Sequence, residues 1–67
     1  MAIGVVKWFN DSKGYGCIEP NEGGESLFAH SSEMDIGGLK TLKPGQLVCF
    51  EKTQGIKGMQ ASDIRVL

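Results

Sequence analysis

The segments KGYGCI, residues 13–18, and SLFAH, residues 26–30, decide how this chain folds. Each is short, lies between turn-forming residues and alternates between two kinds of side chain, which is the pattern of a β-strand. Because successive side chains of a strand point to opposite faces, one face of each segment is aliphatic. The other face carries Tyr15 in the first segment and Phe28 and His30 in the second. Two neighbouring strands with rings on their outer face would form a surface on which flat groups stack.

The opposite orientation, with the rings in the core, is the alternative. It would expose Ile18 and Leu27 to water, and it would bury a face that is flanked by Lys13. The rings would also be hidden if a helix packed over them, but no other segment is long enough to form such a helix. We therefore expect Tyr15 and Phe28 to lie on the outside of the sheet.

Length and composition predict one small domain, which we place at residues 1–67. A chain of this size buries only about 60% of the surface that its unfolded form exposes, so we expect marginal stability. The apolar fraction of 40% is nevertheless enough for a core, which argues against disorder. A closed barrel suits such a chain because closure removes exposed sheet edges.

The charges of the chain are nearly balanced, with a formal net charge of −1. This value argues against a protein that binds duplex DNA by neutralising many phosphates. A nucleic-acid ligand would have to be held by stacking more than by charge. The positive charge is unevenly distributed, since Lys7 and Lys13 lie beside the aromatic segments while Glu19, Glu22 and Glu25 surround the next turn.

The two cysteines, Cys17 and Cys49, form neither a disulfide framework nor a paired metal motif. The sequence shows no signal-peptide pattern and no apolar run of membrane length. We therefore expect a cytoplasmic protein with reduced thiols, no bound metal, no cofactor and no contact with a membrane.

Residues 3–10 form a further candidate strand, whose orientation the sequence leaves open. Strict alternation would put Val6 and Trp8 on one face and Lys7 and Phe9 on the other. A β-bulge, which inserts one extra residue, would instead turn Lys7 and Trp8 both outward. From alternation alone, Trp8 is as well suited to the core as to a binding surface.

Two more candidate strands, residues 46–53 and 59–66, complete the fold. We expect a hairpin turn at 10–14, a type II turn at Pro44-Gly45 and a single helical turn at 31–34. Other turns or irregular connections are expected at 21–25, 39–43 and 54–58. In the first of them Val48 and Phe50 share one face and Leu47, Cys49 and Glu51 the other, and in the second Ala61 and Ile64 are core candidates. Five short strands without a long helix predict an all-β protein, a small five-stranded antiparallel barrel.

Several short motifs also occur along the chain in a characteristic order. They are KWFN at 7–10, KGYGCI at 13–18, LFAHS at 27–31, LKTL at 39–42, PGQ at 44–46 and KGMQA at 57–61. In this order the sequence resembles the bacterial cold-shock proteins over essentially its whole length. The resemblance implies an OB-fold barrel that binds single-stranded RNA and DNA. It also implies a role as an RNA chaperone that keeps transcripts unpaired and, as in some members, as a transcription antiterminator.

The resemblance implies a nucleic-acid-binding surface, because six residues match ligand-binding positions of the family: Lys7, Trp8, Lys13, Tyr15, Phe28 and His30. It places Trp8 on the outside of the barrel and Phe9 at most at the edge of the site. In this interpretation Lys57 or Lys40 extends the track of positive charge. The resemblance assigns the core to Val6, Ile18, Leu27, Ala29, Val48, Phe50 and Ile64.

Three positions of the candidate surface depart from the family pattern. The family usually carries Phe where this chain has Cys17, an aromatic residue where it has Ser31, and commonly an aromatic residue where it has Leu39. Stacking on an aromatic side chain contributes about 1–3 kcal/mol per base. We therefore keep these three residues in the candidate surface but expect weaker binding than is typical of the family.

The resulting functional prediction is a single-stranded nucleic-acid-binding protein of the cold-shock response that is not an enzyme. The sequence has one His, no recognisable nucleophile–base spacing and no phosphate-binding loop before a helix. The expected partners are single-stranded RNA and DNA, without a small-molecule substrate. We expect a monomer, although the long connection at 33–43 leaves a strand-swapped dimer open. The alternative function is a protein-interaction module whose binding face has been repurposed through Ser31 and Leu39.

Overall fold

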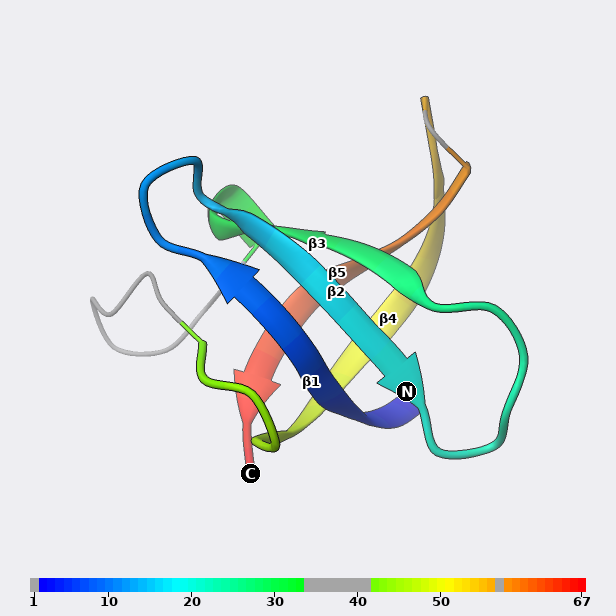
Figure 1. The fold of residues 1–67 in the computed structure, drawn as a ribbon. Helices are drawn as coiled ribbons and strands as arrows, with labels where there is room; N and C mark the ends of the chain where they lie inside the picture. The colour runs from blue at the N-terminus through cyan, green and yellow to red at the C-terminus, as the bar shows by residue number, and fades with distance from the viewer. Residues whose placement is uncertain (1, 34–41, 57) are drawn as a thin grey trace.

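The computed structural model describes residues 2–33, 42–56 and 58–67. The elements within them are β1 (Ala2–Asn10), β2 (Tyr15–Pro20), β3 (Leu27–His30), the 3-10 turn η1 (Ser31–Glu33), β4 (Leu47–Gly55) and β5 (Gly58–Val66). The strands close into a barrel in the order β1-β2-β3-β5-β4, so that β1 lies beside both β2 and β4 (Figure 1). The predicted all-β, five-stranded barrel with an OB-like arrangement is confirmed.

One strand pairing differs from the antiparallel barrel that was predicted. β3 and β5 run parallel, and they pair through Phe28 with Gln60 and Ala29 with Ala61. The other four pairings of the barrel are antiparallel. The reason is geometric, because strand directions cannot alternate all the way around a closed ring of five.

The core lies inside the barrel and takes the aliphatic face of each strand. Its buried residues are Val6, Ile18, Leu27, Ala29, Leu42, Val48, Phe50, Ala61 and Ile64. Every core residue expected from the sequence is therefore buried. Leu42 was assigned only to an irregular connection, yet it is 3% exposed and belongs to the same cluster. The orientation that would have turned Ile18 and Leu27 toward water is excluded.

A β-bulge in β1 decides the orientation that alternation left open. Val6 pairs with Ile18 and Trp8 pairs with Cys17, so the register shifts by one residue between Val6 and Trp8. Lys7 is the extra residue, and both Lys7 and Trp8 are exposed while Val6 is buried. The bulge thus lets one strand contribute an aliphatic residue to the core and place the only tryptophan of the chain on the surface.

The β1–β2 turn is fixed by hydrogen bonds to Asn10, as its turn-forming sequence predicts. The backbone N–H of Gly14 donates to the Asn10 carbonyl (2.8 Å), and the N–H of Lys13 donates to Asn10 Oδ1 (3.0 Å). Gly14 has a φ of 73°, a conformation that favours glycine. η1 lies beside this turn in Figure 1, and the N–H of Ser31 donates to the Gly14 carbonyl (2.8 Å). The end of β3 is therefore tied to the β1–β2 turn.

The β4–β5 hairpin is longer than the sequence indicated. The glycines at its tip predicted a turn over residues 54–58, but β4 continues to Gly55, which pairs with Gly58 at the start of β5. β4 pairs with β1 only from Leu47 to Phe50. The outer half of the hairpin therefore extends beyond the barrel, as Figure 1 shows at the upper right.

Candidate functional site

The aromatic side chains that the sequence analysis identified lie on the outer face of β1, β2 and β3. In β2, Tyr15 and Cys17 alternate with the buried residues Gly16 and Ile18. In β3, the two ring-bearing residues alternate in the same way with buried Leu27 and Ala29. The antiparallel register places Tyr15 opposite His30 and Cys17 opposite Phe28. The bulge in β1 adds Trp8 opposite Cys17 on the other side.

Four rings form a continuous group, which we call the ring platform: Trp8, Tyr15, Phe28 and His30. The ring centroids of Trp8 and Tyr15 lie 5.8 Å apart and the rings meet edge to face at 77°. Tyr15 and Phe28 are separated by 5.6 Å, and Phe28 and His30 by 6.3 Å, with only 30° between the ring planes in each pair. Trp8 is 46% exposed, His30 is exposed, and the two rings between them are half-buried. The platform therefore offers aromatic surface to a ligand across three strands.

His30 is oriented by its neighbour in η1. The backbone N–H of Ser32 donates to His30 Nδ1 (3.1 Å), and Ser32 Oγ lies 2.9 Å from the same nitrogen. A ring nitrogen that accepts an N–H bond carries no proton, so Nε2 holds the ring N–H in this arrangement. The contact with Ser32 holds the imidazole ring in place at the end of the platform.

Cys17 lies within the platform, and Ser31 lies at its edge. The half-buried Cys17 occupies the middle of a row between Trp8 and Phe28. Ser31 packs under the β1–β2 turn, where its Oγ would lie 2.9 Å from a Cβ placed on Gly14. The row of rings across β1, β2 and β3 is therefore interrupted by a thiol.

The positive charge that the sequence placed near the rings is at the margins of the platform. Lys7 is exposed next to Trp8, and its Nζ lies 3.6 Å from Glu19 Oε2 in an ion pair in which both side chains are about half exposed. Lys13 is exposed in the β1–β2 turn. An exposed ion pair contributes little to stability, so Lys7 can exchange its carboxylate partner for a phosphate. The predicted residues Leu39, Lys40 and Lys57 lie outside the described residues.

A hollow beside the platform contains residues that the sequence reasoning missed. It has a volume of about 510 Å³ and is lined by Phe28, Gln54, Gly55, Ile56 and Gln60. Alternation with buried Ala61 indicates that Gln60 points outward. Local sequence patterns do not indicate that β5 lies beside β3, and this pairing brings Gln60 next to Phe28.

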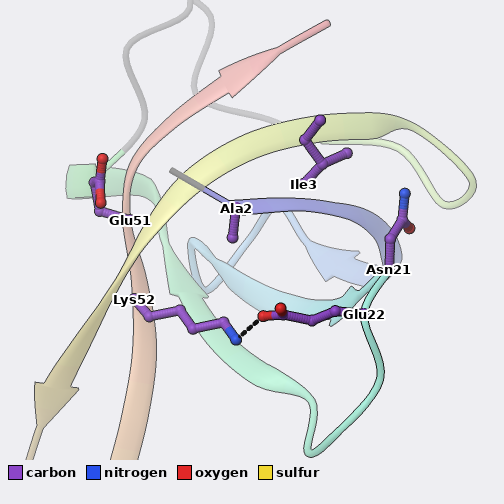
Figure 2. Close-up of a pocket in the computed structure, with 6 residues that line it drawn as sticks. All are labelled: Ala2, Ile3, Asn21, Glu22, Glu51 and Lys52. Atoms are coloured by element: carbon purple, nitrogen blue, oxygen red, sulfur yellow. Dashed lines mark hydrogen bonds and ion pairs between the residues drawn. The ribbon is translucent and has the colours of Figure 1, made fainter.

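A second hollow lies at the other end of β1 and contains none of the rings (Figure 2). It has a volume of about 550 Å³ and is lined by Ala2, Ile3, Asn21, Glu22, Glu51 and Lys52. Figure 2 shows Lys52 and Glu22 reaching toward each other, and the ammonium of Lys52 donates a hydrogen bond to Glu22 Oε1. This hydrogen bond and the charge of Lys52 lower the pKa of the Glu22 carboxyl. The pair joins the β2–β3 connection to β4, which gives this hollow a structural role.

No cluster of three or more His, Cys, Asp or Glu side chains in the described residues is placed to hold a metal ion. No helix in the described ranges is long and apolar enough to cross a membrane.

Comparison with known proteins gives one consistent result. Residues 2–67 match the model of the 'cold-shock' DNA-binding domain. The chain is 52% identical to the cold shock-like protein CspA of Stigmatella aurantiaca over 65 residues, which cover 97% of this chain and 96% of that protein. It is 52% identical to CspA of Bordetella pertussis over the full length of both chains. It is also 53% identical to CspD of Escherichia coli K12 over 64 residues, 96% of this chain and 86% of that one.

Proposed function

The chain belongs to the cold-shock DNA-binding domain family, and from this membership we propose that it binds unpaired RNA and DNA by stacking their bases on the ring platform. Family membership supports nucleic-acid binding in the cold-shock response. The observation that supports the stacking mode is the unbroken series of ring contacts from Trp8 through Tyr15 and Phe28 to His30 on the outer face of the barrel.

The mechanism follows from what a base exposes in each state. An unpaired base offers two π-faces to an aromatic side chain, whereas a base stacked in a duplex offers none. The platform therefore binds single strands and leaves duplexes alone. By mass action it draws transiently open segments away from hairpins. This is the activity of an RNA chaperone, and at a terminator hairpin the same activity produces antitermination.

The lysines beside the platform contribute less to binding than the rings do. Lys7 and Lys13 lie at the margins of the platform, where they would meet the phosphates between stacked bases. Lys7 has to leave Glu19 to do so. With a formal net charge of −1, the chain gains little from counterion release, so stacking supplies most of the affinity.

We propose that the chain is a working but weakened binder, because a thiol interrupts the row of rings across β1, β2 and β3. Cys17 lies where another ring would join Trp8 to Phe28. Ser31 and Leu39 also lack rings. Because each base–ring contact contributes about 1–3 kcal/mol, these positions reduce affinity or shorten the segment of nucleic acid that is bound.

We extend the proposal to the domain organisation, oligomeric state, location and partners of the chain. It acts as one domain spanning residues 1–67, as a monomer in the cytoplasm, without a cofactor and without catalysing a reaction. Its partners are single-stranded RNA and DNA. The candidate surface comprises Lys7, Trp8, Lys13, Tyr15, Cys17, Phe28, His30, Ser31, Leu39 and Lys57.

A fluorescence titration tests the proposed function. Trp8 is the only tryptophan, so its emission reports on the platform alone. We expect quenching by a thymidine oligomer at micromolar concentration, and no quenching by a duplex of matched length. Unchanged emission with the single strand would contradict the proposal and would favour a protein-interaction module on the same barrel.

A further inference from the structure

A continuous aliphatic surface lies on the outer face of β1 and β4. Ile3 and Val5 of β1 alternate with buried residues, so both side chains point outward. The β1–β4 register places Leu47 opposite Val5, and the backbone N–H of Leu67 donates to the Leu47 carbonyl (3.0 Å). Directly opposed residues of an antiparallel pair have their side chains on the same face of the sheet. We call this surface the aliphatic patch: Ile3, Val5, Leu47 and Leu67.

Much of the aliphatic patch is open to solvent. Leu67 is 66% exposed, Leu47 46% and Ile3 45%, and Val5 is half-buried. The buried Cys49 lies opposite Ile3 and forms part of the floor of the patch. Single exposed apolar residues are ordinary on a protein surface, but a contiguous apolar patch with a polar rim is typical of an interaction site.

Opposite charges lie on the two flanks of the patch. On β2, Glu19 is opposite Val5, and on β5, Arg65 is opposite Cys49. Both charged side chains are exposed. Because β2 borders β1 and β5 borders β4, the acidic and the basic side chain lie across the patch from each other. Such a surface is complementary to itself, since a twofold rotation brings the acidic flank of each copy to the basic flank of the other.

We propose that the aliphatic patch is a docking surface for a second copy of this chain, in which two barrels stack patch to patch and Glu19 of each copy lies near Arg65 of the other. Sheets that pack face to face lie about 10 Å apart, with their side chains interdigitated. The aliphatic side chains of both copies then leave water, which drives association. The charges on the flanks determine how the two copies are oriented.

The size of the patch limits the strength of this dimer. A stable interface buries about 800 Å² on each partner. This area is close to one fifth of the 4186 Å² that the chain exposes, if about 800 Å² is taken as the requirement. Partly exposed aliphatic side chains, each smaller than an aromatic one that buries about 150–250 Å², do not reach it. We therefore expect a reversible dimer with a dissociation constant on the order of 0.1 mM, and at lower concentrations the chain is the monomer proposed above.

The proposed dimer leaves the ring platform uncovered. The rings lie on β2, β3 and the Trp8 end of β1, whereas the patch lies on β4, the C-terminal end of β5 and the Ile3 end of β1. Figure 1 shows the C-terminus beside the start of β4, away from β3. Self-association through the patch goes beyond the proposed function and does not depend on it, and a dimer presents two ring platforms.

Sedimentation velocity without nucleic acid tests the proposal. For the unaltered chain, the weight-average mass should rise from that of one copy at about 10 µM toward that of two copies at about 1 mM. Leu47→Lys places a charge in the patch of both copies and should remain monomeric throughout. Ile56→Lys is the matched control, because it adds the same charge at a fully exposed aliphatic residue outside the patch and should associate like the unaltered chain. Circular dichroism checks that each variant is folded.

Reversal of the flanking charges tests the orientation of the two copies. Glu19→Lys and Arg65→Glu should each weaken the dimer by about threefold to tenfold, because exposed ion pairs become repulsive. Both reversals combined in one chain should restore association, since opposite charges again face each other. A combined variant that associates no better than the single ones would contradict the placement of Glu19 near Arg65.

Three results would overturn the dimer. A mass that stays at one copy at every concentration would mean that the patch serves a different partner protein. A dimer that Leu47→Lys does not disperse would mean that association uses another surface, such as strands exchanged through residues 33–43. If Ile56→Lys disperses the dimer as strongly as Leu47→Lys does, added charge alone is responsible and the patch is not the interface.

Discussion

Phe28 is the residue on which the proposed surface converges. Its ring contacts Tyr15 and His30, its strand pairing places it opposite Cys17 and beside Gln60, and it lines the hollow at the hairpin. It is only half-buried and does not belong to the core cluster. Its side chain can therefore be changed with a larger effect on binding than on folding.

Phe28→Ala should weaken binding of a thymidine oligomer by about 1–3 kcal/mol, the contribution of one stacked base. The free energy of unfolding should change far less, because the barrel interior is untouched. Fluorescence titration and urea denaturation of the same samples measure the two effects. A large loss of stability with unchanged affinity would mean that Phe28 serves the core.

Glu19 limits the availability of Lys7, with Oε2 of the carboxylate 3.6 Å from Nζ. Glu19→Gln frees the ammonium for a phosphate and should tighten single-strand binding about twofold to fivefold, the range of an exposed ion pair. Glu25→Gln is the control, because it changes the net charge equally and lies in the exposed connection before β3. An equal gain in both variants would show that net charge alone, and not the release of Lys7, is responsible.

The elements that hold the platform depend on a few local features. The bulge in β1 turns Lys7 and Trp8 outward, and the hydrogen bond from Ser31 to Gly14 ties the end of β3 to the β1–β2 turn. The third feature is the ion pair of Glu22 with Lys52, which links the loop between β2 and β3 to β4. Each of these can be tested by its effect on stability.

Gly14→Ala should destabilise the barrel more than Gly23→Ala. Both glycines have positive φ, 73° and 93°, so each alanine costs about 1–2 kcal/mol in backbone conformation. At Gly14 the new Cβ would also lie 2.9 Å from Ser31 Oγ, whereas at Gly23 no atom of the described residues lies within 4 Å. Urea denaturation compares the two variants. Equal losses would mean that contact between the turn and η1 does not constrain the fold.

The Glu22–Lys52 pair predicts a pH dependence of stability. Because the hydrogen bond and charge of Lys52 lower the pKa of Glu22 below its usual value of 4.5, the pair stabilises the folded state above that pH. The contribution is lost as the pH falls through the lowered pKa. Glu22→Gln should therefore lower the melting temperature slightly at pH 7 and leave it unchanged at pH 2. A difference that persists at pH 2 would contradict this assignment.

The faces of the strands could be predicted because side-chain direction in a strand has a period of two. That period placed Ile18, Leu27 and Ala29 in the core and Tyr15 outside, and the structure confirms each. It could not decide the face of Trp8, because a bulge interrupts the period inside β1.

Contacts between distant elements could not be predicted from local sequence patterns. The parallel pairing of β3 with β5 follows from closure of the barrel, and only this pairing brings Gln60 to Phe28. Gly55 and Gly58 indicated a turn, yet they pair with each other as the last step of a ladder that the preceding residues stabilise. Leu42 lies in the core although its segment has no strand pattern, because its burial depends on contacts with distant elements.

On the scale of the whole molecule, the formal net charge of −1 leads us to expect that the barrel binds through its rings more than through charge. If Lys7 and Lys13 each meet one phosphate, the logarithm of the binding constant should fall with the logarithm of the salt concentration with a slope of about −1.4. Titrations of a thymidine oligomer at salt concentrations from about 50 to about 400 mM measure this slope. A slope steeper than about −3 would show that charge dominates and would contradict binding led by stacking.

The central claim is that unpaired bases lie against the ring platform. Intermolecular NOEs between a thymidine heptamer and the isotopically labelled protein test it most directly. The account predicts contacts from base protons to the ring protons of Trp8, Phe28 and His30. Contacts confined to the hollow between Ala2 and Lys52, with none to the rings, would contradict it.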